Sequence, residues 1–451
     1  MRKKIIYYSS LVATFILLSL SLFSNFTYSP FNADNVKENI TLFSSDTYKG
    51  RLAGSQGNSL VGEIIRKNFT DNKLIPLNDD YKESFKVLSP INNNTLPYLK
   101  IAYDDGYSES LKYGVDYKED MINFRKTNFT FSNEDKINVF SNYIEVSTSE
   151  GTCLFYLSPK NDFSFRSSFI STFPYDMMVM INTNTYNKIL DSIKEGAEVS
   201  INIPFSIEEK EIFNIVGVIE GSSSKLPPLI LTAHYDHLGS DALKNIYYGA
   251  LDNASGTSFL LEIERALSTY GKPKRDIIFV ALNAEEFGLL GSKSFAENNL
   301  DKIKDAEVIN FDMIGSDGYP LTLMLGASSK DKDSKLLDSI EKIAKNNNVE
   351  TKVTYENSSD HASFNDLGID ALSFSHSDLT KIHTPNDKVE YISTDAINSA
   401  YSVIEEKVFD SSYGFITKFF YGKTSIFIFS ILFAFIASSP LTTYIKKRKI
   451  R

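Results

Sequence analysis

From about Ile212 onward, short apolar runs alternate with stretches whose apolar residues recur at helical spacing. Leu229 to Thr232 and Ile277 to Leu282 are apolar runs that predict buried strands, and between them Ser255 to Tyr270 places its apolar residues on one helical face. The alternation continues through further predicted strands and helices: Val308 to Phe311, Leu321 to Leu325, Ser334 to Lys345, Ala371 to Phe374 and Thr394 to Val408. This pattern predicts an α/β fold, with a mostly parallel mixed sheet covered by helices on both faces.

The first half of the chain has a different pattern. Residues 85–208 contain short alternating runs, such as Tyr98 to Ala102 and Thr152 to Leu157, separated by many Asn and Asp residues. This composition predicts a β-rich domain. Residues 34–84 have helical spacing broken by paired glycines, so we expect them to join residues 209–411 in one unit, with the β-rich domain inserted between.

Both ends of the chain carry apolar segments. Residues 1–33 contain the apolar core Leu11 to Phe23 behind a basic start, which is typical of a signal peptide or an N-terminal anchor. Residues 424–445 are uncharged and apolar and predict a transmembrane helix, followed by a basic tail at 446–451. Because basic flanks stay in the cytoplasm, we expect a protein of the cell membrane whose body is extracytoplasmic.

Charge narrows the range of partners. The formal net charge of −10 becomes −18 for the body when the eight basic residues of the two ends are set aside: Arg2, Lys3, Lys4, Lys446, Lys447, Arg448, Lys449 and Arg451. Such an acidic body argues against binding to nucleic acid or anionic lipid. Cys153 is the only cysteine, so the chain forms no intrachain disulfide and no thiolate metal cluster.

Potential metal ligands follow several of the predicted strands. Two imidazoles and three carboxylates are a sufficient ligand set for a pair of zinc ions that share one bridging carboxylate. Because the ligands include histidine, zinc is favoured over magnesium and calcium, although Co²⁺ or Mn²⁺ could occupy the same site. The candidate residues are His234, Asp236, Asp252, Glu285, Glu286, Asp312 and His383.

Local geometry suggests roles for some of these side chains. Asp236 lies two residues after His234 in an extended segment, so its carboxylate can accept the second N–H of the imidazole. The two oxygens of Asp252 could each hold one metal ion. Glu285 and Glu286 diverge after a strand, so one can bind metal while the other acts as general base.

Six segments of the chain resemble one known family. They are Thr232 to Gly239, Gly249 to Gly256, Asn283 to Ser292, Asn310 to Gly315, Ser359 to Phe364 and Ile382 to Asp387. The family is that of the co-catalytic di-zinc exopeptidases, which includes secreted bacterial aminopeptidases, glutamate carboxypeptidase and the transferrin receptor. Phe43 to Gly54 resembles the N-terminal segment of the family as well.

The resemblance implies specific roles. His234, Asp252 and Asp312 would hold one zinc ion, and Asp252, Glu286 and His383 the other. Glu285 would be the general base, and the peptide bond after Asp252 would be cis. The resemblance also implies that residues 85–208 are a divergent protease-associated domain.

The predicted function is that of a membrane-anchored, extracytoplasmic di-zinc aminopeptidase. It would remove N-terminal residues from peptides by attack of a metal-bridging water. A carboxypeptidase needs a cationic clamp for the substrate carboxylate, yet Arg265 and Arg275 are the only arginines between Ile212 and Asp410. The competing predictions are a carboxypeptidase, a glutaminyl-cyclase-like acyltransferase with one zinc, and a catalytically silent receptor-like binding protein.

The remaining histidines have less specific interpretations. His237 lies on the opposite strand face from His234 and is expected to be structural. The resemblance implies that His361 borders the site without binding metal. No partner is predicted for His376.

Overall fold

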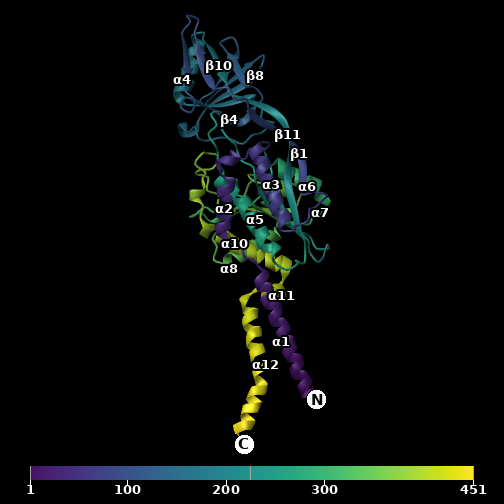
Figure 1. The fold of residues 1–451 in the computed structure, drawn as a ribbon. Helices are drawn as coiled ribbons and strands as arrows, with labels where there is room; N and C mark the ends of the chain where they lie inside the picture. Colours follow the sequence, from purple (N-terminus) through teal and green to yellow (C-terminus); the bar gives the residue numbers. More distant parts are fainter. Residues whose placement is uncertain (1, 224, 450–451) are drawn as a thin grey trace.

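The computed structural model describes residues 2–223 and 225–449. Figure 1 shows a body with a β-rich part at one end and a helix-covered sheet below it. Two long helices project from the end of the body opposite the β-rich part, and both chain termini lie at their far ends.

The larger part of the body is built on a mixed sheet of eight strands. Its four central strands, in the order β13-β12-β14-β17, are parallel, and the flanking strands include antiparallel pairs. In sheet order the strands are β1 (Lys82–Asn92), β11 (Phe205–Ile219), β13 (Ile277–Leu282), β12 (Leu229–His234), β14 (Glu307–Phe311), β17 (Asp370–Ser375), β15 (Leu321–Leu325) and β16 (Thr351–Tyr355).

Helices cover both faces of this sheet because successive side chains of the buried strands point to opposite sides. Leu229 and Leu231 of β12 pack into one hydrophobic cluster and Ile230 into another. The first cluster includes α2 (Ala33–Phe43), α3 (Gln56–Asp71), α5 (Gly256–Ser268), α8 (Lys335–Asn346) and α10 (Thr394–Val408). The second includes α6 (Leu290–Asn298), α7 (Leu300–Ile303) and α9 (His361–Asp366). The predicted mixed α/β fold is thus confirmed.

Two long strands connect the sheet to the β-rich part. β1 and β11 pair antiparallel from Lys82 with Ile215 to Asn92 with Phe205, and this ribbon extends out of the central sheet (Figure 1). One sheet of the β-rich part contains β3 (Ser108–Leu111), β2 (Tyr98–Ala102), β10 (Glu198–Asn202) and β5 (Asn128–Phe131). The other contains β4 (Tyr117–Phe124), β9 (Met177–Ile181), β8 (Gly151–Leu157), β7 (Tyr143–Thr148) and β6 (Lys136–Val139), with α4 (Thr183–Lys194) beside them.

The two projecting helices come from opposite ends of the sequence. α1 (Arg2–Thr27) and α12 (Lys423–Lys449) lie side by side and run in opposite directions, and α12 follows the short α11 (Phe415–Tyr421) (Figure 1). At their base, Asn25 Nδ2 donates to the carbonyl of Phe420 at 3.0 Å.

Length and composition distinguish these helices. Lys4–Thr27 is by itself long and apolar enough to cross a membrane. α11 and Lys423–Ser438 are long and apolar enough only when taken together, and the two are bent by 74°. The predicted span at 424–445 falls within α12, but the side chains beyond Ser438 lie outside the described ones. The clearest candidate span in the described structure is therefore N-terminal, where the sequence is also compatible with a removable signal peptide.

Candidate metal centre

The parallel strands bring the candidate ligands to one edge of the sheet. His234 is the last residue of β12, Asp312 directly follows β14, and Glu285 and Glu286 follow β13. Because these three strands are parallel neighbours, their carboxyl ends meet. Asp252 lies in the turn before α5, and His383 lies in the loop between β17 and α10.

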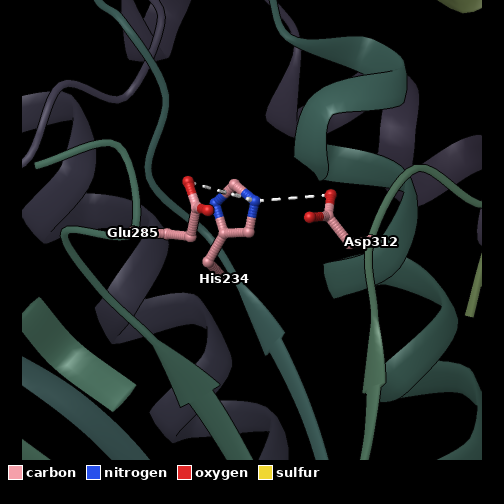
Figure 2. A group of neighbouring side chains, drawn as sticks. All are labelled: His234, Glu285 and Asp312. Atoms are coloured by element: carbon pink, nitrogen blue, oxygen red, sulfur yellow. Dashed lines mark ion pairs between the residues drawn. The ribbon is translucent and has the colours of Figure 1, made fainter. Parts of the chain in front are cut away.

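One group of candidate ligands surrounds His234 (Figure 2). Its Nε2 atom lies 3.6 Å from Asp252 Oδ1, 3.6 Å from Asp312 Oδ1 and 4.0 Å from Glu285 Oε2. Ligand atoms of His234, Glu285 and Asp312 lie within 4.8 Å of one another.

A second group surrounds His383. Its Nε2 atom lies 3.2 Å from Asp252 Oδ2 and 3.4 Å from Glu286 Oε2. Asp252 therefore presents one carboxylate oxygen to each imidazole, a geometry suited to a ligand shared by two metal ions.

Unpaired polar atoms test whether this arrangement fits metal ions. Nδ1 and Nε2 of His234 and Oδ1 of Asp312 are buried, and none has a hydrogen-bond partner among the residues that the structure describes. Buried polar atoms are normally paired. Imidazole nitrogens and carboxylate oxygens that converge in this way fit divalent cations such as zinc.

Asp236 holds both glutamates through their backbone. Its Oδ1 accepts the amide of Glu285 at 3.1 Å, and its Oδ2 accepts that of Glu286 at 3.2 Å. The contact expected with the His234 imidazole measures 3.5 Å from Nδ1 to Oδ1, at the outer limit of a hydrogen bond. The closer partners of Asp236 are thus the two adjacent acids.

Two residues without a role in the sequence-based prediction hold the segment around Asp252. Asp387 accepts the amides of Leu251 and Asp252 at 2.8 and 3.0 Å. Arg51 is fully buried and donates to the carbonyls of Tyr248 and Gly249, both at 2.8 Å. The peptide bond between Asp252 and Asn253 is cis, as the resemblance implies.

The many buried acids of the site raise the pKa values of His383 and Glu285. Burial lowers the pKa of His383, but the charge of Glu286 and the contact with Asp252 outweigh it and raise the pKa to about 9. Burial, with the charges of Glu286, Asp360 and Asp312, raises the pKa of Glu285 well above its usual value against the opposing effect of His234. Such an excess of negative charge favours a bound cation.

His237 also enters the site, contrary to the expectation of a structural residue on the opposite face. Its Nδ1 lies 2.9 Å from Glu286 Oε1 and 3.8 Å from Asp252 Oδ2. The alternation of strand faces does not apply to it because β12 ends at His234. Burial lowers the pKa of His237 to about 3, which keeps the imidazole neutral.

A cavity of about 430 Å³ opens onto both ligand groups. Its far wall is one face of the last three strands of the sheet, where Ser375 of β17 pairs with Thr322 of β15 and Thr322 with Lys352 of β16. Met324 and Thr354 lie on the same wall. The cavity also contacts Ser168 from the β-rich part, which the sequence could not link to the site.

Residues 214–408 match the profile described as Peptidase family M28. This match, here called the M28 segment, covers fewer than half of the residues of the chain. It contains every candidate residue named from the sequence, so the predicted relation to zinc exopeptidases is confirmed.

Two curated proteins are similar to part of this chain. "Aminopeptidase YwaD" from Bacillus subtilis (strain 168) is 31% identical over 208 residues, which cover 44% of this chain and 44% of the relative. "Glutamate carboxypeptidase 2 homolog" from Caenorhabditis elegans is 32% identical over 145 residues, which cover 31% of this chain and 18% of the relative. The chain thus spans less than half the length of these relatives.

A solved structure extends the likeness over most of the fold. The zinc aminopeptidase BSAP from Bacillus subtilis aligns with a TM-score of 0.59 at 19% identity, covering 86% of this chain and 98% of that chain. At this identity the likeness establishes a shared fold. The alignment is longer than the M28 segment and so includes residues outside 214–408.

Proposed function

We propose that the chain is a membrane-anchored, extracytoplasmic zinc metallopeptidase that acts as an aminopeptidase. The observation that carries the proposal is the position of Asp252 between two imidazoles, with a different oxygen facing each. His234, Asp252 and Asp312 would hold one zinc ion, and Asp252, Glu286 and His383 would hold the other. The match of residues 214–408 to a peptidase family supports this assignment.

Two zinc ions held there would lower the pKa of a water molecule and polarise the scissile carbonyl. Glu285 lies beside the ligands, with Oε2 4.0 Å from His234 Nε2, and is the candidate general base. Oε2 would accept a proton from the attacking water and later donate it to the leaving amine. Asp236 positions this glutamate because it accepts the amide of Glu285.

Charge in the cavity supports cleavage at the amino end of a peptide. Five of its lining residues are acidic: Asp252, Glu285, Glu286, Asp312 and Glu356. Asp252, Glu286 and Asp312 are assigned as metal ligands, so Glu285 and Glu356 are the carboxylates left to attract the α-ammonium group of a substrate. An N-terminal amine would therefore be oriented toward the metals, with its side chain in the remainder of the cavity.

One observation favours carboxypeptidase activity as a second candidate. Lys352 lines the cavity wall, and its ammonium group forms no hydrogen bond or ion pair with any residue that the structure describes. A free ammonium group can bind a substrate carboxylate. N-acetylated peptides with a free carboxyl end would be cleaved by a carboxypeptidase alone, and amidated peptides with a free amine by an aminopeptidase alone.

Metal content and turnover separate a peptidase from a cyclase-like transferase and from a silent binding protein. Glutaminyl-cyclase-like enzymes use one zinc ion, whereas this chain carries candidate ligands for two metal positions. Receptor-like members of the exopeptidase family usually lose ligands. Measuring the zinc content together with the hydrolysis of an amino-acid amide distinguishes all three classes.

We also propose that both terminal helices anchor the protein in the membrane. The basic residues at the start of α1 and those at the end of α12 fall at the same end of the antiparallel pair, which supports a cytoplasmic location for both termini. α1 packs along α12, where the ring centroids of Phe15 and Phe433 lie 6.0 Å apart. These contacts support retention of the N-terminal segment. The purified protein should therefore keep its N-terminal sequence, and a chain that begins near residue 25 would contradict this arrangement.

The enzymatic proposal is tested on the full-length chain in detergent. The chain would be incubated with a panel of N-terminal aminoacyl amide reporters, with and without a chelator. We expect hydrolysis that the chelator abolishes and added zinc restores. Absence of hydrolysis across the panel, in protein that contains zinc, would contradict aminopeptidase activity.

A further inference from the structure

A loop of the β-rich part reaches the candidate metal centre. It follows β8 and precedes β9, and its residues 162–170 lie outside the M28 segment. Ser168 on this loop donates a hydrogen bond from Oγ to Glu286 Oε2 at 2.9 Å. The same serine lines the cavity that the candidate ligands share.

Glu286 is held on both of its carboxylate oxygens. His237 Nδ1 lies 2.9 Å from Oε1, while Ser168 bonds to Oε2, the oxygen that lies 3.4 Å from His383 Nε2. The next residue, Phe287, packs edge-on against Phe169 of the loop, with ring centroids 5.1 Å apart. The loop therefore contacts both Glu286 and its neighbour.

The loop has its own supports. The amide of Ser167 donates to Asp120 Oδ1 at 3.0 Å, and the Tyr247 hydroxyl donates to the carbonyl of Ser164 at 3.0 Å. The guanidinium group of Arg166 is buried over the ring of Tyr247, 5.1 Å from its centroid. The segment that carries Ser168 is thus held both by the β-rich part, through Asp120, and by the M28 segment, through Tyr247.

Beside this loop, buried charged side chains join the β-rich part to the M28 segment. Lys118 Nζ lies 3.2 Å from Asp241 Oδ2, and both side chains are buried. Glu119 Oε1 accepts the amide of Ala242 at 2.8 Å. A displacement of the β-rich part would break this ion pair and this hydrogen bond.

We propose that Ser168 is a positioning residue for Glu286, so that the β-rich part completes the metal position formed by Glu286 and His383. This inference rests on the proposed function. The hydroxyl orients the oxygen that faces His383, and a hydrogen bond to a ligating carboxylate aids metal binding. The position formed by His234 and Asp312 receives no such contact from Ser168.

The test measures zinc affinity rather than turnover. The metal-free full-length chain in detergent is titrated with zinc against a chromophoric chelator. Ser168→Val and Ser168→Thr have nearly the same shape and differ in the hydroxyl group. Ser171→Ala is the matched control, because Ser171 is exposed on the same loop.

We expect Ser168→Val to lower the affinity for one of the two zinc ions by about 10- to 100-fold and to leave the affinity for the other unchanged. Ser168→Thr and Ser171→Ala should bind both ions as the parent chain does. If Ser168→Val does not fold, Ser168→Ala, which adds no atoms, should give the same selective loss.

Two results would overturn the inference while leaving the proposed function intact. One is a hydroxyl-free variant that binds both ions as tightly as the parent. The other is an equal loss at both ions, accompanied by a lower melting temperature. A parent chain that binds fewer than two zinc ions would instead contradict the proposed function itself.

Discussion

Oδ2 of Asp387 accepts the backbone amide of Asp252 at 3.0 Å. Oδ1 of Asp387 accepts the preceding amide, that of Leu251, at 2.8 Å. Asp387 therefore determines where the carboxylate that faces both imidazoles can lie. Burial raises the pKa of Asp387 to about 7, against the effect of these two amide donors and of nearby Arg51.

Replacing Asp387 should weaken both metal positions together. Asp387→Asn presents an amide group where two backbone N–H groups need acceptors, so one donor loses its partner. We expect zinc affinity to fall by about 10- to 100-fold at both positions. Chelator competition measures the effect, with Asp317→Asn in an exposed turn as control. Unchanged affinity would mean that Asp252 is held by other contacts.

Glu285→Gln should separate chemistry from metal binding. The amide cannot accept a proton from water, so kcat should fall by about 10²- to 10⁴-fold. The zinc content should stay at the parent level because Glu285 is not assigned as a ligand. Glu341→Gln, which removes an exposed acid of α8 outside the cavity, is the control and should keep the parent activity. A Glu285→Gln enzyme that turns over like the parent would exclude Glu285 as the base.

Lys352→Met should change substrate choice. If the ammonium group binds a substrate carboxylate, kcat/KM for dipeptides or for acidic side chains should fall by about tenfold or more, since hydrogen bonds between charged groups contribute about 1.5 to 3 kcal/mol. Neutral aminoacyl amides should be affected little. Comparing free and amidated dipeptides, and acidic and neutral N-terminal residues, identifies which carboxylate is bound. A uniform loss across all substrates would argue against carboxylate recognition.

Much of this centre could be predicted from sequence because its ligands follow strands. His234 and Asp312 end or follow buried runs that are recognisable by their apolar residues, and parallel packing brings their ends together. Asp252 and His383 lie in loops, and their place depended on resemblance to the family motifs. The α/β alternation was predictable for the same reason as the strand ends, since buried strands and one-sided helices carry strong periodic patterns.

The supporting contacts were not predictable, because they join distant segments through irregular structure. Arg51 and Asp387 lie far apart in sequence and meet around the turn that holds Asp252. Ser168 reaches Glu286 across 118 positions from a loop without periodic pattern. His237 was misjudged because strand alternation was extended beyond the end of β12.

A buried acid away from the centre predicts a pH effect on stability. Burial raises the pKa of Glu264 to about 8, although Asn72 donates to one of its oxygens. In the unfolded chain the same carboxyl titrates near its usual value of 4.5. The folded state thus binds more protons between these values, and the stability that the neutral acid contributes at low pH is lost as pH rises toward 8.

Glu264→Gln should remove this dependence. The variant should be more stable than the parent at pH 8 by on the order of 1 to 3 kcal/mol, with little difference at pH 5. Thermal unfolding in detergent at the two pH values, with zinc in excess, measures the change. An equal change in stability at both pH values would mean that the effect does not come from titration of Glu264.

Zinc analysis of the full-length chain tests the central claim most directly. After purification with zinc and removal of loosely bound metal, elemental analysis against protein concentration gives the number of ions per chain. The account predicts two zinc ions in the parent and a loss at both positions in Asp252→Ala, because that residue would serve both. A parent chain that holds fewer than two zinc ions, or an Asp252→Ala variant that keeps both ions, would contradict it.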